Sequence, residues 1–303
     1  MEITTIIFQI ILIITVAPAI SGIISKLKNN IRMRKGQSIF QPYYNLAKLF
    51  CKDEVVSITA SWIFMVAPFV VFSSTLTAAM LMLVFIFSPT CQFGVFLAFI
   101  FILSLGRFFM ALSALDTGSA FGGMGASREM FISSLVEPVL CLVVFALFLQ
   151  SASVNAAASS QPFLVSSVVS AAALFLVIIA ETSRIPVDNQ ETHLELTMVH
   201  EAMVLEYSGR SLAFIEIASY IKQMILFLLI AQIIFPVSAP VSIGLAQLVF
   251  WFLWYLARIV IVIIMVVLTE VSLAKMRLFR VVDFLSFGFM LGVVAVVCAI
   301  LGV

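Results

Sequence analysis

The chain has 303 residues, of which 63% are hydrophobic and 10% are charged, and its mean hydropathy is +1.24. These values lie far outside the range of soluble domains, so they exclude a soluble enzyme and indicate a single membrane domain over residues 1–303. The formal net charge of +1 gives no indication of a nucleic-acid partner, because the basic residues collect where a membrane protein meets the cytoplasm.

Eight apolar stretches are long enough to cross a bilayer, since a membrane-spanning helix needs about 20 apolar residues. They lie at residues 3–24, 60–87, 93–115, 132–154, 163–180, 212–235, 241–269 and 283–301. The sequence therefore predicts an all-α integral membrane fold with about eight transmembrane helices. Because the first stretch follows the acidic Glu2 and lacks a basic leader, we expect it to be a retained span and not a cleaved signal.

The charged residues collect in alternate loops, at about 25–59, 116–131, 181–211 and 270–282. The turns between them, at 88–92, 155–162 and 236–240, carry no charge. The positive-inside rule places the charged loops in the cytoplasm, which predicts a multi-pass protein of the inner (cytoplasmic) membrane with both termini outside. The glycine-rich stretch GSAFGGMGASRE in the second charged loop is expected to form a flexible turn.

The segment 32–57 is too polar to span the bilayer, yet aromatic and leucine residues alternate with polar ones along it. The apolar members are Phe40, Tyr43, Tyr44, Leu46, Leu49 and Phe50, and the polar ones are Gln41, Asn45, Lys48 and Lys52. This spacing predicts an amphipathic helix at the membrane interface, after the first span. A plain anchor to the lipid surface is the simpler interpretation of the same pattern.

The loop 181–211 holds six of the chain's 15 carboxylates: Glu181, Asp188, Glu191, Glu195, Glu201 and Glu206. On a helix beginning after Pro186, the residues Asp188, Glu191 and Glu195 would share one face. Neighbouring carboxylates raise one another's pKa, so such a cluster can pass protons near neutral pH. The alternative is a solvated acidic edge whose carboxylates pair with Arg184 and Arg210.

Five ionisable residues fall inside the apolar stretches: Arg107, Glu137, Glu216, Lys222 and Arg258. A charge at the bilayer centre costs at least about 2.5 kcal/mol, so each needs a partner on another helix or a hydrated cavity. Lys222 and Arg258 are expected near mid-bilayer. The set indicates a hydrated route for protons or sodium ions, with Lys222 as a relay, while ion pairs that only fix helix packing are the alternative.

No metal site or catalytic residue is expected on this chain. The four cysteines are scattered singly, which argues against an iron–sulfur cluster held by this chain alone and places any electron carrier on a partner. His193 and His200 are about 10 Å apart on a helix, too far to share one ion directly, and HExxH, GxGxxG, P-loop and nucleophile-elbow motifs are absent from the sequence.

Three sequence segments resemble the respiratory complex I subunit 1 family, and within it the branch found in membrane-bound nickel–iron hydrogenases of hydrogenase-4 and formate hydrogenlyase type. The segments are QPYYNLAKLFCKDE, ALDTGSAFGGMGASREMFISSLVEPVL and ETSRIPVDNQETHLELTMVHEAMVLEYSG. The resemblance covers nearly the whole chain and implies a subunit of a group 4 nickel–iron hydrogenase, an oxidoreductase complex. Such a subunit docks a cytoplasmic redox arm and couples electron transfer to proton or sodium translocation.

The resemblance also implies partners and cofactors. The expected partners are hydrogenase-like large and small subunits, an iron–sulfur subunit, antiporter-like membrane subunits and the lipid bilayer. The nickel–iron centre and the iron–sulfur clusters would lie on those partners, and quinone is a possible ligand. In quinone-reducing relatives, the loop 181–211 and the amphipathic segment wall a quinone chamber; at one position of that loop this chain has His193 where those relatives have a glutamate.

Together, these arguments predict two groups of site residues. The ion-pathway or coupling group is Asp116, Glu129, Glu137, Asp188, Glu191, Glu195, Glu201, Glu206, Glu216, Lys222 and Arg258. The group that docks the arm or lines a quinone-like chamber is Arg32, Arg34, Lys35, Gln41, Lys48, Glu181, Arg184 and His193. The rival interpretations are the quinone-chamber subunit of a complex I-like NADH–quinone oxidoreductase, a secondary ion transporter, and a purely structural anchor.

Overall fold

A computed structural model describes residues 3–57, 59–87, 93–156, 165–188, 199–234 and 245–302. Over these ranges the protein is helical and contains no strand, so the all-α prediction is confirmed. The helices are α1 (Ile3–Ile31), α2 (Gln41–Phe50), α3 (Trp62–Phe87), α4 (Phe93–Asp116), α5 (Ala120–Ala156), α6 (Val165–Glu181), α7 (His200–Val204), α8 (Gly209–Ile234), α9 (Leu245–Ser272) and α10 (Leu278–Leu301).

Each predicted apolar stretch coincides with one long helix, and α2 and α7 are the short ones. Within the described ranges, six helices are long and apolar enough to cross a membrane: α1, α3, α4, α5, α8 and α10. Helix α6 is apolar but, with 17 residues, is shorter than these six. Helix α9 has 28 residues. The prediction of a multi-pass membrane protein is therefore confirmed.

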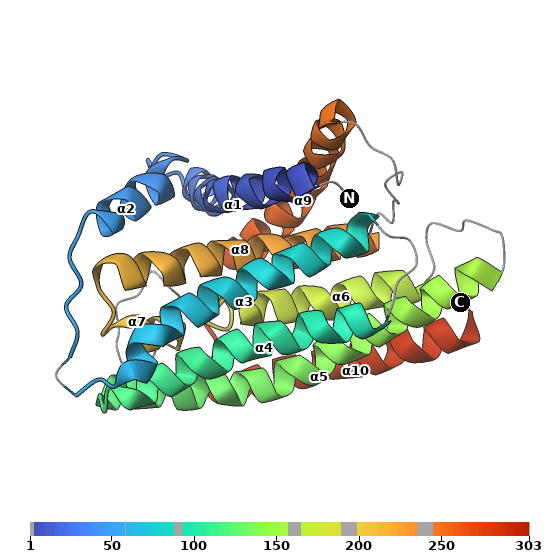
Figure 1. Cartoon of the computed structure of the whole chain (residues 1–303). Coiled ribbons are helices and arrows are strands. Elements are labelled where there is room, and N and C mark those ends of the chain that lie inside the picture. The colour runs from blue at the N-terminus through green and yellow to red at the C-terminus, as the bar shows by residue number, and fades with distance from the viewer. Residues whose placement is uncertain are drawn as a thin grey trace.

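The long helices run side by side, except α9, which crosses the others steeply (Figure 1). Helix α3 packs on α4 and α8, while α10 packs on α5 and α6. The core centres on α8, where Ile221, Met224 and Phe227 are fully buried. Because α8 is enclosed by helices from both halves of the chain, the polar side chains in its central turns, Lys222 and Gln223, face protein.

The glycine-rich stretch is not the flexible turn expected from its composition, because Gly122, Gly123 and Gly125 lie inside α5. A side chain at Gly125 would lie 2.9 Å from the Cβ atom of Ala202 and 3.0 Å from the backbone oxygen of Val199. A glycine at this position therefore lets α5 pass close to α7, which brings the loop before α8 against the helix bundle.

Helix α2 confirms the predicted amphipathic helix. Its buried side is Pro42 and Leu46, while Tyr44 is exposed. The Tyr43 hydroxyl donates a hydrogen bond to the carbonyl oxygen of Thr15 on α1. Gly22 of α1 lies directly beneath the Ile39 carbonyl, where a side chain would collide with it. The chain therefore folds back along α1, and α2 packs beside α8.

The segment between α2 and α3 is tied to the N-terminus of α8. Glu54 accepts hydrogen bonds from the backbone nitrogen of Ser211 (2.6 Å) and from its Oγ (2.8 Å). The backbone nitrogen of Val55 donates to Ser208 Oγ at 2.8 Å. A carboxylate here satisfies an N–H group at the start of the helix and stabilises the helix dipole.

Replacing Glu54 with glutamine is expected to loosen the first turn of α8, because the charged cap is lost. The expected cost is about 1 kcal/mol, the usual value of an N-terminal cap. Hydrogen exchange of residues 209–214 in the purified complex would measure it. Asp53→Asn is the matched control, since Asp53 contributes only its backbone oxygen near Gly209; equal protection in both variants would contradict the prediction.

Candidate functional site

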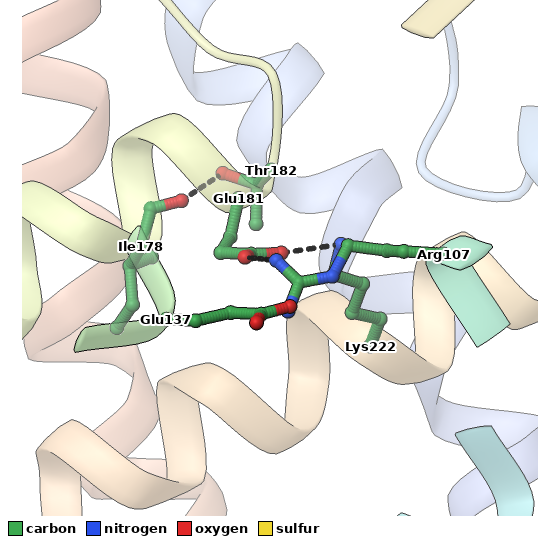
Figure 2. Close-up of polar contacts among 6 residues, drawn as sticks. All are labelled: Arg107, Glu137, Ile178, Glu181, Thr182 and Lys222. Carbon is green, nitrogen blue, oxygen red and sulfur yellow. Dashed lines mark hydrogen bonds and ion pairs between the residues drawn. The ribbon is translucent and has the colours of Figure 1, made fainter. Parts of the chain in front are cut away.

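A buried ion cluster joins four helices (Figure 2). Arg107 of α4 contacts Glu137 of α5 at 2.8 Å and also binds Glu181, the last residue of α6. Lys222 of α8 contacts the second oxygen of Glu181 at 2.5 Å. We call these residues the deep cluster. Glu181 is its shared ligand, because both cations bind that carboxylate.

Burial makes the deep cluster energetically demanding. The exposed fractions are 8% for Arg107, 4% for Glu181 and 17% for Lys222, whereas Glu137 is 36% exposed. A carboxylate at the C-terminal end of a helix is also disfavoured by the helix dipole. The two cations offset both costs, so removing either one would leave a buried charge without its partner.

A second group of charges lies near the end of α9. Glu270 contacts Arg184 at 2.7 Å and Lys28 of α1 at 3.2 Å. Asp188 contacts Lys275 at 2.7 Å and accepts a hydrogen bond from the backbone nitrogen of Val199 at 3.0 Å. We call these five charged residues the loop cluster. It fastens the segment after α6 to α1, to α9 and to the α9–α10 connection.

Glu270 follows the apolar stretch that ends at residue 269. Burial by itself would raise the pKa of this carboxyl, but the neighbouring Arg184 and Lys28 hold it below its ordinary value. The interaction therefore contributes stability above the ordinary carboxyl pKa and loses it as the pH falls through the lowered value. At neutral pH Glu270 is ionised and binds both cations.

Three adjoining cavities connect the two clusters. The first, of about 100 Å³, is lined by Arg107, Glu181 and Lys222, and the third, of about 150 Å³, by Lys28, Asp188 and Glu270. The second, of about 250 Å³, is bordered by the carboxylate-bearing residues Glu201 and Glu216. The cavities share lining residues. Ser21 of α1 lines all three, and Arg184 lines the first and the third. The first and second cavities also share His200, Ser219 and Tyr220.

These cavities suit water. A buried water needs about 10–15 Å³ of such space and two or more polar partners. In the first cavity the lining residues Arg107 and Gln223 each have a buried nitrogen, Nε and Nε2, without a protein partner. Buried donors of this kind normally bind ordered water. The arrangement can therefore hold a hydrated polar tract from the loop cluster to the deep cluster.

Comparison with known proteins places the chain in a family. The family model described as NADH dehydrogenase matches residues 3–301. The chain belongs to this NADH dehydrogenase family. The resemblance to complex I subunit 1 inferred from its motifs is thereby confirmed.

Among curated relatives, this NADH dehydrogenase-family chain is 31% identical to hydrogenase-4 component C of Escherichia coli (strain K12), over 95% of the chain and 92% of the relative. It is 27% identical to formate hydrogenlyase subunit 4 of the same organism, over 89% of the chain and 90% of the relative. It is also 27% identical to an NADH-quinone oxidoreductase subunit of Syntrophotalea carbinolica, over 66% of the chain and 67% of the relative.

The fold of this family member is also found in a solved structure, that of the membrane-bound sulfane sulfur reductase, an archaeal respiratory membrane complex. A chain of that complex aligns with a TM-score of 0.76, covering 97% of this chain and 99% of its own length at 19% identity. Since the identity is low, this likeness concerns the fold.

The structure brings together seven residues of the two predicted groups. Glu137, Glu181 and Lys222 belong to the deep cluster, and Arg184 and Asp188 to the loop cluster. Glu201 and Glu216 border the cavity between them. Glu181 and Arg184 were expected in the docking or chamber group, yet Glu181 lies in the deep cluster, between Arg107 and Lys222.

Other predicted residues lie apart from these cavities. Asp116 accepts a hydrogen bond from the backbone nitrogen of Ser61 at 2.8 Å and so fixes the start of α3. Glu129 is buried within α5, Glu206 is exposed between α7 and α8, and the Arg258 guanidinium lies 5.4 Å from the Trp254 ring centre on α9.

Five of the predicted docking or chamber residues lie between the end of α1 and the end of α2. Arg34, Lys35 and Lys48 are exposed, and Arg32 and Gln41 are half-buried. Glu191, His193 and Glu195 lie outside the described residues.

The expectation that a helix begins after Pro186 is wrong for the described part of this loop. Residues 185–187 form a turn, Asp188 is not helical, and the next described helix, α7, begins at His200. Asp188 is 1% exposed because it pairs with Lys275 instead of facing an acidic neighbour. Similarly, Arg184 pairs with Glu270, which lies outside its own loop.

Sequence reasoning did not single out four residues of the site: Lys28, Glu270 and Lys275 of the loop cluster, and Gln223 of the first cavity. Glu270 was counted only as loop charge, although a lone carboxylate at the end of a long apolar stretch is a signal for a buried partner. Gln223 adjoins Lys222 and lines the first cavity. Nothing in the local sequence distinguishes it from an ordinary polar residue of a helix.

Proposed function

We propose that this chain is the membrane subunit of a group 4 nickel–iron hydrogenase complex of hydrogenase-4 or formate hydrogenlyase type. In that role it docks the cytoplasmic redox arm and couples electron transfer to translocation of protons or sodium ions. The similarity to hydrogenase-4 component C over 95% of the chain supports the type of complex. The polar tract between the loop cluster and the deep cluster supports the coupling role.

The proposal assigns each part of the chain a place. Residues 1–303 form one domain in the inner membrane, with the charged loops in the cytoplasm and both termini outside. The redox arm, made of hydrogenase-like large and small subunits and an iron–sulfur subunit, docks on the loop side near Arg34, Lys35 and Lys48. Those partners carry the nickel–iron centre and iron–sulfur clusters, and antiporter-like subunits pack within the membrane.

Coupling in this proposal is electrostatic. Reducing a docked cluster adds negative charge near the loop cluster, which shifts the proton affinity of nearby carboxylates. The change passes along the acids that border the second cavity, Glu201 and Glu216, to the Glu181–Lys222 pair. Glu191, Glu195 and Glu206 complete the proposed pathway at its entrance.

A quinone-chamber role is the second candidate, because the chain resembles an NADH-quinone oxidoreductase subunit over 66% of its length. The second cavity lies where such a chamber would be expected, beside α2 and α8. Its volume of about 250 Å³ is below the range of about 300–1,000 Å³ typical of sites for organic ligands. This favours water and ions over a quinone.

The composition of the purified complex tests the proposed function most directly. We expect nickel, iron and a hydrogenase-like large subunit to co-purify with a tagged copy of this chain. Metal analysis and mass spectrometry of the subunits would measure this. A complex with quinone reductase activity, sensitive to a quinone-site inhibitor and free of nickel, would favour the second candidate. Ion transport by the isolated chain in liposomes would instead indicate a secondary transporter.

Replacing Lys222 with glutamine is expected to abolish ion translocation while the arm still reduces artificial acceptors, because the relay cation is lost from the polar tract. Membrane vesicles containing a pH-sensitive or a sodium-sensitive dye measure translocation and identify the ion. Lys26→Gln is the matched control, since Lys26 is exposed on α1. Undiminished translocation by an assembled Lys222→Gln complex would remove this residue from the pathway.

A further inference from the structure

An apolar groove opens on the surface between α9 and α10, apart from the polar tract. Its volume is about 430 Å³, and its floor is formed by α6 and α8. The lining is almost entirely apolar: Val168, Ala171, Ala172, Phe175, Leu176, Ile230, Ile234, Met265, Phe287 and Leu291, with Ser167 as the polar exception. Phe287 is 60% exposed and Met265 is 41% exposed in the chain by itself.

The groove exists because two consecutive helices pack on different parts of the bundle. Helix α9 packs on α1 and α8, whereas α10 packs on α5 and α6. Figure 1 shows α9 crossing steeply while α10 runs with the bundle. The two helices therefore diverge from the loop that joins them, and an apolar space is left between them at membrane depth.

A cation lies two turns before the groove, on the same face of α10 as two of the lining residues. Arg280 precedes Phe287 by seven residues and Leu291 by eleven, which puts each of them within about 20° of Arg280 around α10. Arg280 is exposed. The rise from Arg280 to Leu291 is about 16 Å, close to the thickness of one hydrocarbon leaflet, which is about 15 Å.

These dimensions favour a lipid chain over a protein helix. A helix is about 10 Å wide, so one leaflet's length of it occupies on the order of 1,000 Å³, more than twice the groove. A single acyl chain is narrower and has no polar backbone to satisfy. An arginine about one leaflet from Leu291 along α10 matches a phosphate in charge and in hydrogen-bonding geometry.

We propose that the α9–α10 groove binds one acyl chain of an anionic phospholipid whose phosphate is held by Arg280. The lipid fills the space between the diverging helices and so supports the steep course of α9, which carries Glu270 to the loop cluster. Asp283 lies one turn from Arg280 and is also exposed, so it is the nearest acidic residue on this helix. The proposal does not depend on which redox arm the chain docks.

Native mass spectrometry of the purified complex in phosphatidylglycerol nanodiscs, with phosphatidylcholine nanodiscs as the comparison, tests this inference. Ala172→Trp fills the exposed floor of the groove, and we expect it to reduce retained phosphatidylglycerol at least tenfold. Arg280→Ala removes the phosphate ligand, and we expect about tenfold weaker retention of phosphatidylglycerol, the usual effect of losing a hydrogen bond to a charged group. Retention of phosphatidylcholine should be lower than that of phosphatidylglycerol in the parent complex.

Two control variants separate the groove from the general membrane surface. Phe289→Trp places a tryptophan on the opposite face of α10, and Lys26→Ala removes an exposed cation elsewhere. Both should retain the lipid as the parent complex does. Equal retention by Ala172→Trp and Phe289→Trp would overturn the proposal. Equal retention of both lipids by the parent complex would also overturn it. If Ala172→Trp kept its lipid but lost a membrane subunit, the occupant of the groove would be a helix of that subunit, and the proposal would be wrong.

Discussion

Replacing Glu181 with glutamine is expected to abolish ion translocation and to destabilise the complex by about 3–5 kcal/mol, the usual cost of leaving buried charges without their partner. Glu181 is the common ligand of Arg107 and Lys222, so its loss affects both cations at once. The melting temperature of the purified complex and dye-monitored pumping in vesicles measure the two effects. Asp283→Asn, at an exposed site on α10, is the control for carboxylate loss.

A double variant separates stability from function. In Glu181→Gln with Lys222→Met, one buried cation is removed together with the carboxylate, and Arg107 keeps its contact with Glu137. We expect a melting temperature closer to that of the parent complex than in Glu181→Gln alone, but no recovery of pumping. If the double variant recovered both the melting temperature and pumping, the deep cluster would serve only helix packing. If Glu181→Gln alone melted and pumped like the parent complex, the first prediction would be contradicted.

Replacing Lys275 with methionine is expected to release the segment after α6 from the α9–α10 connection. Asp188 would then be a buried carboxylate without this cation, at a cost of about 1–3 kcal/mol. The hydrogen bond from the Met276 nitrogen to the Pro186 oxygen, 2.9 Å long, belongs to the same attachment and should weaken with it. Hydrogen exchange of residues 184–188 and 273–277 reports the release.

The same variant tests whether the attachment contributes to coupling. We expect fewer ions translocated per electron pair in Lys275→Met, because the charges of the loop cluster are held less firmly once Asp188 loses this cation. Asp188→Asn combined with Lys275→Met completes a double-mutant cycle, which isolates the interaction energy of the pair. Arg277→Met changes an exposed cation of the same connection and should leave both readouts unchanged. Additive single effects would show that the pair does not act as a unit.

The membrane-spanning helices could be predicted from the sequence because length and hydropathy determine them. The stretch 93–115 became α4, Phe93–Asp116, almost without change. Composition was misleading in the glycine-rich stretch, where Gly125 serves close packing against Ala202 and does not form a turn. A glycine pattern alone does not distinguish these uses, since the neighbour that requires the small residue lies far along the chain.

The candidate site was predictable as a set of residues but not as a set of pairs. A charge such as Lys222 within an apolar stretch indicates that a partner exists, because isolation in hydrocarbon is costly. It does not identify that partner. Arg107 and Glu181 are 74 residues apart in sequence, and Arg184 and Glu270 are 86 apart, so the packing of the helices decides the pairing. This is why Asp188 was assigned to an acidic face and instead pairs with Lys275.

The deep cluster has a consequence for stoichiometry. Its two cations, Arg107 and Lys222, are balanced by two carboxylates, Glu137 and Glu181, so the group as a whole is electroneutral. A proton that neutralised either carboxylate would leave the group with a surplus positive charge, which its two cations would disfavour. In the proposed ion pathway, an ion that enters this group is therefore expected to displace another, so that passage through it is one-for-one exchange.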